Sequence, residues 1–299
     1  MTISVVGAGA FGTALAIALA REGRDVTLWA RDKNAAEYMQ RTRANDAKVQ
    51  GVSFPSRIVV TSDFHVAAQN EIILRKALIA CCKGFEVSTG IGPCGILETV
   101  TDRVAILTGP SFAHDIARGL PTALTLAARD HALGQVLQTC LGTKSLRLYT
   151  TTDIVGAELG GALKNVIAIA CGATMGAGLG ESARAALMTR GYAEMLRMAK
   201  SLGAQPQTLS GLSGFGDLSL TCMSTGSRNY RFGVSLGRGE VFDASVTVEG
   251  AATANAALTK AKEFGLDMPI TKAVDALVQG RIDVQAAIDI LLTRPQKEE

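Results

Sequence analysis

The sequence is poor in aromatic residues, in proline and in net charge. Aromatic residues make up 5% of its 299 residues, there are 7 prolines, and the formal net charge at pH 7 is +3. Because its 30 Lys and Arg residues are scattered rather than clustered, the sequence predicts no nucleic-acid-binding surface. A hydrophobic content of 47% excludes general disorder, since a chain of this length can bury a full core in one large or two moderate domains.

Metal-ligand spacing and targeting signals are also missing from the sequence. The 6 cysteines form no CxxC pair and the 3 histidines stand apart, so we expect no metal site. Residues 1–12 contain no basic segment ahead of an apolar stretch, and no uninterrupted apolar run of about 18 residues follows. We therefore expect neither an export signal nor a membrane span, and a cytoplasmic protein with reduced thiols.

Glycine, by contrast, is abundant, with 32 residues, and its first cluster has a distinctive setting. Residues 3–6 are β-branched and apolar and predict a buried strand, residues 13–21 predict a helix, and residues 25–29 predict a second strand. The segment GAGAFG at residues 7–12 joins the first strand to the helix. This order predicts a strand-helix-strand unit of the dinucleotide-binding, Rossmann type.

The three glycines of this segment have different expected roles. Gly7 permits the tight turn, Gly9 lets the backbone approach a pyrophosphate, and Gly12 allows the helix to pack closely on the strand. The amide groups at the helix N-terminus supply hydrogen-bond donors and positive potential for the anion. We therefore expect a dinucleotide cofactor.

The end of the second predicted strand bears on which dinucleotide is bound. An arginine at this place can pair with the 2′-phosphate of NADP, whereas an acidic residue accepts a hydrogen bond from the 2′-hydroxyl of NAD. Arg31 favours NADP or NADPH, while Asp32 next to it leaves NAD open. A solvated pair of loop charges is the alternative without any cofactor contact.

The pattern of apolar residues in the remaining chain changes near residue 151. Before it, short apolar segments predict further strands of a mostly parallel sheet, at residues 58–60, 71–74, 77–82, 104–107, 122–126 and 146–149. After it, long Ala-, Leu- and Gly-rich segments have helical spacing. We expect an α/β Rossmann-type domain over residues 1–152, followed by an all-α domain over residues 153–299.

Polar residues follow two of the predicted strands. Lys83 comes directly after one of them, at the sheet edge where ligands of such folds bind. Gly109 and Ser111 follow another strand. We expect Ser111 to be a helix N-cap, either by itself or together with backbone amides that contact a ligand.

The helical half adds a lysine in an unusual setting. Lys164 stands inside an apolar, small-residue helix, where a lysine usually reaches the surface with its charged end. A buried lysine has a lowered pKa instead, and can act as a general base near neutral pH. Asp217 and Arg228 stand in glycine-flanked polar turns that suit a phosphate; the alternatives are a helix-capping Asp217 and a surface-exposed Arg228.

Together these motifs resemble the NAD(P)-dependent glycerol-3-phosphate dehydrogenases. The matching segments extend from residue 7 to about residue 254: GAGAFGTALA, LWARD, CCKGFE, LTGPSFAHDIARGLPTAL, ELGGALKNVIAIA, ARAALMTRG, GLSGFGDLSLTC, TGSRNYRFG and VEGAATA. The resemblance implies reversible reduction of dihydroxyacetone phosphate, a small-molecule substrate, to sn-glycerol 3-phosphate for phospholipid synthesis. It also implies a homodimer.

The resemblance assigns individual roles as well. Lys164 corresponds to the proton acceptor of the family. The positions that correspond to substrate-binding residues are Lys83, Gly109, Ser111, Asp217, Ser227, Arg228 and Asn229. The positions that correspond to cofactor-binding residues, together with the glycine motif, are Gly7, Gly9, Ala10, Phe11, Gly12, Arg31, Lys83, Ala113, Arg228 and Glu249.

One departure from the family pattern stands between Leu74 and Lys83, where roughly 25 residues are absent. The connection that remains is too short for the crossover that a parallel sheet requires. Either a segment is missing from the sequence or the cofactor-binding face is altered. Two alternatives to the dehydrogenase therefore stay open: a dinucleotide-binding sensor with impaired catalysis, and an NADP-dependent keto-acid reductase of the same architecture.

Overall fold

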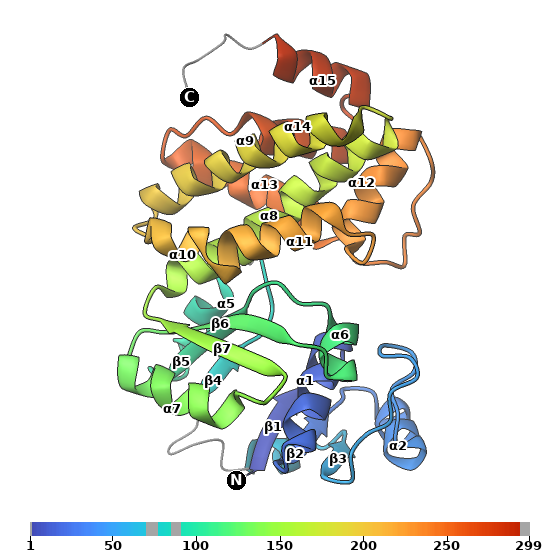
Figure 1. The fold of residues 1–299 in the computed structure, drawn as a ribbon, viewed down its shortest axis with the longest axis vertical. Helices are drawn as coiled ribbons and strands as arrows, with labels where there is room; N and C mark the ends of the chain where they lie inside the picture. The colour runs from blue at the N-terminus through green and yellow to red at the C-terminus, as the bar shows by residue number, and fades with distance from the viewer. Residues whose placement is uncertain (1, 70–76, 85–90, 294–299) are drawn as a thin grey trace. The chain divides into compact units, whose positions relative to one another are not determined.

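A computed structural model describes residues 2–69, 77–84 and 91–293 of the chain (Figure 1). The chain divides into two compact units. Unit 1 comprises Met1–Cys81, Leu97–Leu107 and Ser111–Thr152, and unit 2 comprises Cys82–Ile96, Thr108–Pro110 and Asp153–Glu299. Two short segments of the N-terminal half thus belong to the helical unit, and each of them contains a residue of the candidate site.

The strands of unit 1 form two sheets within the described residues. The first has the order β1 (Thr2–Val6), β2 (Asp25–Trp29) and β3 (Ile58–Thr61), and the second has the order β4 (Leu78–Ala80), β5 (Val104–Thr108), β6 (Thr122–Ala128) and β7 (Leu146–Thr151). The pairs β1–β2, β2–β3, β4–β5 and β6–β7 are parallel, which confirms the predicted strand direction. The strand expected at residues 71–74 lies outside the described residues.

Helices connect the strands of unit 1: α1 (Ala10–Arg21), α2 (Lys33–Thr42), α3 (Phe64–Gln69), α6 (Ala113–Arg118) and α7 (His131–Leu141), with the short α5 (Pro93–Leu97) at the boundary of the two units. Helix α1 begins three residues earlier than predicted, because Gly9 is already extended and serves as its N-cap. Ala10, Phe11 and Gly12 therefore already belong to the helix.

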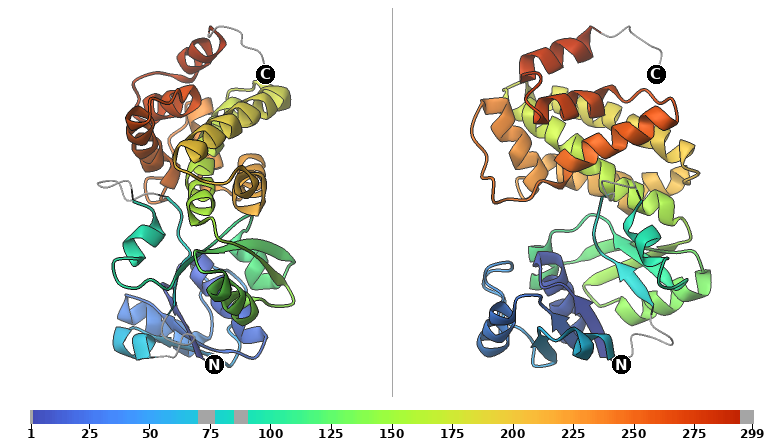
Figure 2. Two further views of the ribbon diagram at one scale, coloured as in Figure 1. Left: turned by 90° about the vertical axis from the view of Figure 1, so that its left-hand side faces the viewer. Right: turned by 180° about the vertical axis from the view of Figure 1, so that it is seen from behind.

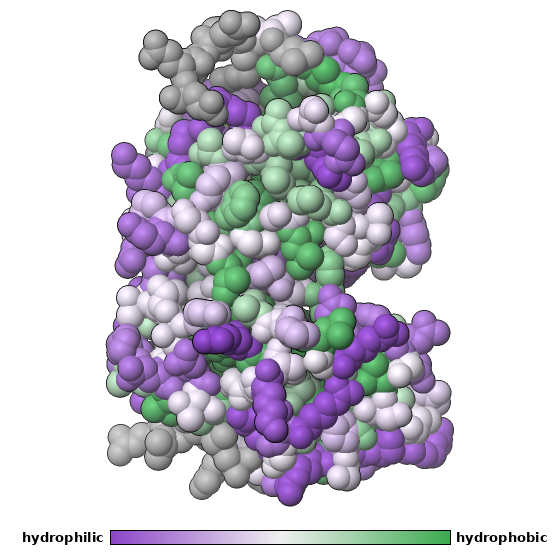
Figure 3. Space-filling model, in the orientation of Figure 1, coloured by the Kyte–Doolittle hydropathy of each residue, from purple (hydrophilic) through white to green (hydrophobic). Residues whose placement is uncertain are grey.

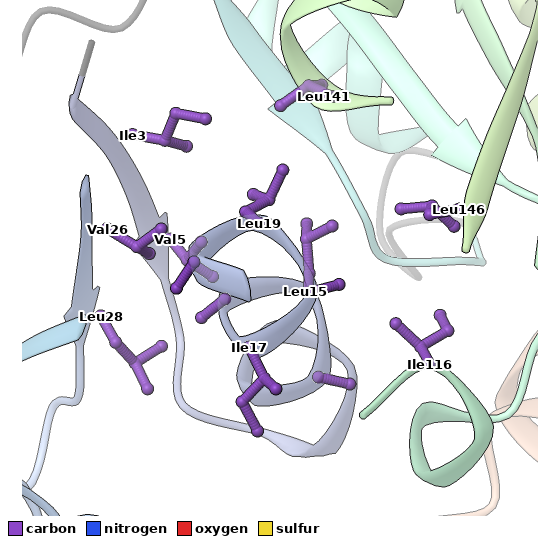
Figure 4. Packing of buried hydrophobic residues seen from close by; sticks show 14 of the residues in the cluster. Ile3, Val5, Leu15, Ile17, Leu19, Val26, Leu28, Ile116, Leu141 and Leu146 are labelled. Atoms are coloured by element: carbon purple, nitrogen blue, oxygen red, sulfur yellow. The ribbon is translucent and has the colours of Figure 1, made fainter. Parts of the chain in front are cut away.

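The core of unit 1 is built around α1. Every residue of α1 from Thr13 to Ala20 is buried, because alanines alternate with larger apolar side chains and let the helix approach the sheet. Leu15, Ile17 and Leu19 point from this helix into the core, where β1 and β2 also contribute side chains (Figure 4). Each such buried side chain contributes about 1.5–3 kcal/mol to folding.

Unit 2 is helical in its described part beyond residue 153. Its elements are α8 (Ile154–Gly176), α9 (Gly180–Ser201), α10 (Pro206–Ser210), the π-helix η1 (Leu212–Gly216), α11 (Asp217–Met223), α12 (Arg228–Arg238), α13 (Glu249–Glu263), α14 (Pro269–Val278) and α15 (Val284–Leu292). Helix α8 runs through the middle of this unit, and α9, α11, α12, α13 and α14 all pack on it (Figure 2).

Glycines explain how closely α12 approaches α8. A Cβ atom on Gly172 would lie 2.1 Å from the carbonyl oxygen of Tyr230, and one on Gly233 would lie 2.1 Å from that of Ile169. Both helices therefore need glycine at their contact, because their backbones touch there.

On the surface of unit 2 that Figure 3 shows, hydrophilic and hydrophobic residues are intermixed.

Among the described residues, α8 is the one helix long and apolar enough to cross a membrane. However, 89% of its apolar 18-residue window is buried inside the protein. Its apolar character is therefore explained by its place at the centre of unit 2.

Candidate active site

The glycine turn of unit 1 has the backbone that a pyrophosphate site needs. Gly7 has a φ of +112°, which side chains rarely allow, and its N–H donates to the carbonyl oxygen of Trp29 at 3.0 Å. A Cβ atom on Gly12 would lie 2.1 Å from the carbonyl oxygen of Gly7, so helix α1 can approach the turn only with glycine there. At Gly9 a Cβ atom would meet nothing within 4 Å.

These residues fit a dinucleotide phosphate. Gly9, the N-cap of α1, is exposed, and the first turn of the helix contains no acidic residue and no side-chain cap. The N-terminal amide groups of this 12-residue helix carry the positive end of its dipole. Ala10 and Phe11, in the same turn, are half-buried.

Sequence reasoning missed a buried residue that braces this turn. Asn45 is 7% exposed, and its Nδ2 donates to the carbonyl oxygen of Ala8 at 3.0 Å and to Oγ1 of Thr13 at 2.9 Å. It lies more than 30 residues along the chain from both partners, and no local pattern marks it. The turn is therefore held by a side chain as well as by its own glycines.

The cofactor-specificity residues of unit 1 behave differently from each other. Arg31 is exposed. Asp32, also exposed, is the N-cap of α2, and its Oδ1 accepts a hydrogen bond from the N–H of Ala35 at 2.9 Å. Capping therefore accounts for an acidic residue at this place without any cofactor contact.

In unit 2, Lys164 is buried inside the protein rather than directed to its surface. The residue is 7% exposed, and its Nζ donates to Oδ1 of Asp217 at 2.6 Å and to Oγ1 of Thr221 at 2.8 Å. The expectation that a lone lysine reaches the surface is thus wrong here, because α11 supplies two polar partners to a helix that is otherwise enclosed.

A second lysine shares the same carboxylate. Nζ of Lys83 donates to Oδ2 of Asp217 at 2.6 Å and to the carbonyl oxygen of Gly109 at 3.3 Å. Asp217 is fully buried, whereas the side chain of Lys83 keeps 19% of its surface exposed. One buried carboxylate therefore joins two ammonium groups, one enclosed and one partly open.

This arrangement changes the acidity of Lys164. Burial, which is the larger cause, and the positive charge of Lys83 together lower the pKa of Lys164 from 10.5 to about 8. The carboxylate of Asp217 acts in the opposite sense. Because desolvation and like charge outweigh the carboxylate, both the ammonium and the neutral amine of Lys164 are accessible near pH 8.

The segment GLSGFGD positions Asp217 through close backbone contacts. A Cβ atom on Gly214 would lie 1.9 Å from the carbonyl oxygen of Leu209, and one on Gly160 of α8 would lie 2.3 Å from that of Ser213. Gly160 lets the π-helix η1 lie directly on α8, Gly214 lets η1 lie directly on the end of α10, and α11 then begins with Asp217.

Asp217 does not cap a helix with its side chain, as the alternative interpretation held, since Gly216 is the N-cap of α11 and no side-chain cap bond is made. Thr221, one turn later, donates from Oγ1 to the carbonyl oxygen of Asp217 at 2.6 Å. Sequence reasoning overlooked Thr221; its spacing of four residues from Asp217 on one helix face was the available signal.

A polar network joins three helices of unit 2. Nη2 of Arg228 lies 3.1 Å from Oε1 of Glu249, and Nδ2 of Asn165 donates to Oε2 of Glu249 at 3.3 Å. Oδ1 of Asn229 accepts from the N–H of Gly250 at 2.9 Å. Arg228 is therefore paired as well as 48% exposed, which differs from a simple surface charge.

Two of the predicted serines have different places. Ser227 is the N-cap of α12, and its Oγ accepts from the N–H of Tyr230 at 3.2 Å. Ser111 is not an N-cap, contrary to expectation, because α6 begins at Ala113 and Phe112 occupies the cap position. One residue, the extended Phe112, thus separates Ser111 from the helix.

Comparisons with known proteins match both halves of the chain. Family descriptions of the NAD-dependent glycerol-3-phosphate dehydrogenase N-terminus match residues 2–77 and 68–134, and that of the C-terminus matches residues 153–289. Glycerol-3-phosphate dehydrogenase [NAD(P)+] of Ruegeria sp. (strain TM1040) is 55% identical over 321 residues, which cover 100% of both chains. The enzyme of the same name from Cereibacter sphaeroides is 54% identical over 99% of this chain and 100% of its own.

A solved structure is similar as well. Glycerol-3-phosphate dehydrogenase from Coxiella burnetii has a TM-score of 0.89 and 31% sequence identity, with 98% of this chain and 99% of that chain covered.

The comparisons also bear on the departure from the family pattern. The alignment with the Ruegeria relative covers 321 positions, whereas this chain has 299 residues, so the relative contains about 22 residues without a counterpart here. The N-terminal family description matches in two pieces that meet around residues 68–77. With both halves matched and the similarity extending over the full length, the chain belongs to the NAD-dependent glycerol-3-phosphate dehydrogenase family.

Proposed function

We propose that this chain is an NAD(P)-dependent sn-glycerol-3-phosphate dehydrogenase, which reversibly reduces dihydroxyacetone phosphate to sn-glycerol 3-phosphate for phospholipid synthesis. The observation that carries the proposal is the pair of lysines on one buried carboxylate, with the buried Lys164 and the partly exposed Lys83 both bonded to Asp217. Two relatives that bear this activity in their names are 55% and 54% identical over almost the full length.

Lys164 is the proposed acid–base residue. In the oxidation of glycerol 3-phosphate, its neutral amine takes the proton of the C2 hydroxyl; in the reduction of the ketone, its ammonium returns a proton to the oxygen. A pKa of about 8 makes both forms usable near neutral pH. Asp217 and Thr221 hold the Nζ atom in place through the two hydrogen bonds described above.

The proposed phosphate-binding groups lie at the start of α12. Arg228 offers a planar fork for phosphate oxygens, and its side chain remains 48% exposed while Glu249 holds one end of it. Ser227 and Asn229 flank it at the helix N-terminus, where the helix dipole favours an anion. Lys83, Gly109, Ser111 and Asp217 complete the proposed substrate-binding set.

The glycine turn is the proposed site of the cofactor. Gly7, Gly9, Ala10, Phe11 and Gly12 would bind its pyrophosphate, and the further proposed contacts are Arg31, Lys83, Ala113, Arg228 and Glu249. When bound, the nicotinamide supplies or accepts the hydride. Because Asp32 is engaged as the cap of α2 and Arg31 is exposed, we propose a preference for NADPH over NADH.

The division of labour between the halves is part of the proposal. Residues 1–152 would bind the dinucleotide and add Lys83, Gly109 and Ser111 to the substrate site, and residues 153–299 would carry the catalytic lysine and the other substrate-binding groups. We further propose a cytoplasmic homodimer, on the strength of the family resemblance. Light scattering at several protein concentrations tests the dimer.

One observation favours a second candidate, a dinucleotide-binding sensor without turnover. The alignment with the Ruegeria relative is 22 positions longer than this chain, and the N-terminal family description matches in two pieces that overlap at residues 68–77, ahead of Lys83. A change at this place affects the cofactor-binding half while leaving the lysine pair of unit 2 in place.

One experiment separates the two candidates. The purified 299-residue chain, checked by intact mass, is mixed with dihydroxyacetone phosphate and with NADH or NADPH, and nicotinamide absorbance is followed. Rapid oxidation of one cofactor supports the dehydrogenase. Cofactor binding without oxidation overturns the dehydrogenase in favour of the sensor. A separate assay with a branched 2-keto acid as the substrate tests the reductase.

A further inference from the structure

Two adjacent glycines of α8 have different neighbours. Gly160 faces the backbone of η1 and serves helix packing, as described above. At Gly161, a Cβ atom would lie 3.0 Å from Oγ1 of Thr108, 3.2 Å from Cγ of Lys83 and 3.4 Å from Cδ of Lys83. The stem of Lys83 and the hydroxyl of Thr108 therefore close around the place where any other residue would have a side chain.

The contact at Gly161 involves the lysine that shares the carboxylate. The aliphatic stem of Lys83 lies against α8 at Gly161, and its Nζ then reaches Oδ2 of Asp217 and the carbonyl oxygen of Gly109. Gly161 and Lys164 are three residues apart and so lie on the same face of α8. The notch and the enclosed lysine are thus neighbours on one helix surface.

Thr108 forms the other wall of the notch. It is 1% exposed, and its Oγ1 is one of the few buried side-chain atoms in the described residues without a hydrogen-bond partner. A side chain so enclosed, with its hydroxyl directed at the notch, has little freedom to move aside for a methyl group on Gly161.

We propose that Gly161 is a positioning residue of the reaction. The missing side chain forms a notch that seats the stem of Lys83 against α8, and this seat sets the distance between the two lysines on Asp217. The inference rests on the proposed function for its kinetic consequences, but the geometry of the seat does not depend on turnover.

The pKa of Lys164 depends on the position of Lys83 and therefore reports on the seat. Lys83 lowers the pKa of Lys164 and Asp217 raises it. Cys222 of α11 also faces this lysine, whose charge lowers the pKa of the thiol, although burial keeps that pKa well above the usual value. Arg184 of α9, Arg228 of α12 and Glu249 of α13 are among the charged groups on helices packed against α8.

A displaced Lys83 changes this balance in one direction. Moving its ammonium away removes a positive charge from the neighbourhood of Lys164. The carboxylate of Asp217 then interacts with the ammonium of Lys164 alone. Both effects raise the pKa of Lys164 above about 8. The substitution Gly161→Ala should not lower the stability of the fold, because alanine is a better helix former than glycine in the middle of a helix.

The test is Gly161→Ala, read by three measurements. The titration of Lys164 is followed by NMR of selectively labelled lysines, with Lys164→Arg to assign the signal. We expect its midpoint to rise, kcat to fall on the order of tenfold, and Tm to hold or rise by a few degrees. Gly134→Ala in α7, where a Cβ atom meets only ordinary contacts at 3.8 Å, is the matched helix control and should leave the midpoint and kcat unchanged.

A second variant tests the notch itself. Thr108→Ala removes the atom closest to the new Cβ, so Gly161→Ala combined with Thr108→Ala should recover part of the lost kcat and of the shifted midpoint. An unchanged Lys164 midpoint in Gly161→Ala would overturn the positioning role. A shifted midpoint in a chain whose unsubstituted form has no turnover would support the seat and reject the proposed function.

Discussion

The Nζ atom of Lys164 lies 2.6 Å from Oδ1 of Asp217, and both residues are buried. A carboxylate at this distance stabilises the ammonium, yet the pKa of Lys164 is lowered to about 8. Desolvation and the charge of Lys83 therefore exceed the attraction of Asp217. The lysine is held firmly by its partner and is still able to release its proton near neutral pH.

Lys164→Ala should abolish turnover and leave cofactor binding intact. Loss of a general acid–base group reduces rates by about 10² to 10⁴. The measurement is kcat in both directions, together with the fluorescence titration of bound NADPH. Lys200→Ala, at an exposed lysine near the end of α9, is the control and should behave as the unsubstituted protein. Near-normal turnover by Lys164→Ala would remove this residue from the mechanism.

The two directions of the reaction should have opposite pH dependences. Oxidation needs the neutral amine of Lys164, so its rate should rise with pH through about 8. Reduction needs the ammonium, so its rate should fall as pH rises through the same value. Profiles of kcat from pH 6 to pH 10, roughly two units on each side of this midpoint, check the sign. Parallel profiles in the two directions would contradict the assignment of one shared group.

Asp217→Asn should shift the alkaline limit of the reduction to lower pH. Asp217 raises the pKa of Lys164, so a neutral amide at this place lets that pKa fall below about 8. The variant should also unfold more easily, by about 3–5 kcal/mol, because two lysines lose their shared counter-charge. Denaturant titration at pH 7 measures the second effect, and an unshifted limit would show that Asp217 does not control Lys164.

Gly9→Ala should separate cofactor binding from folding. A Cβ atom at Gly9 meets no protein atom within 4 Å, and the φ of −70° suits any residue, so Tm should stay within a few degrees. The added methyl group would occupy the space in which a pyrophosphate approaches the backbone, so the Kd for NADPH should rise at least tenfold. An unchanged Kd, measured by calorimetry, would place the dinucleotide elsewhere.

Gly12→Ala is the contrasting variant in the same turn. A Cβ atom there would lie 2.1 Å from the backbone oxygen of Gly7, which cannot move aside cheaply. This substitution should therefore lower both Tm and cofactor affinity.

Arg31→Ala should weaken NADPH selectively. The loss of a charge-assisted pair with the 2′-phosphate removes about 1.5–3 kcal/mol from NADPH binding and leaves NADH binding nearly unchanged. The ratio of kcat/KM for the two cofactors measures the effect. If kcat/KM falls by the same factor for both cofactors, Arg31 does not recognise the 2′-phosphate.

Local sequence patterns determined much of the fold. Strand β2 has the predicted bounds of residues 25 and 29, because a short apolar, β-branched run limited by polar residues specifies a buried strand by itself. The GAGAFG segment specified its turn for a similar reason: the positive φ of Gly7 favours glycine, and at Gly12 there is no room for a Cβ atom. Motif order also identified Lys164, Asp217 and their family.

Only the tertiary structure decided what these residues do to one another. The periodicity of α8 could not tell a buried Lys164 from one that reaches solvent, because its partner Asp217 is 53 residues further on, and Lys83 is 134 residues from that same carboxylate. Thr221, Asn165 and the notch at Gly161 likewise emerged from helix packing. Backbone preference acts over a few neighbouring residues, whereas burial, ion pairing and pKa depend on atoms that the chain brings together only when it has folded.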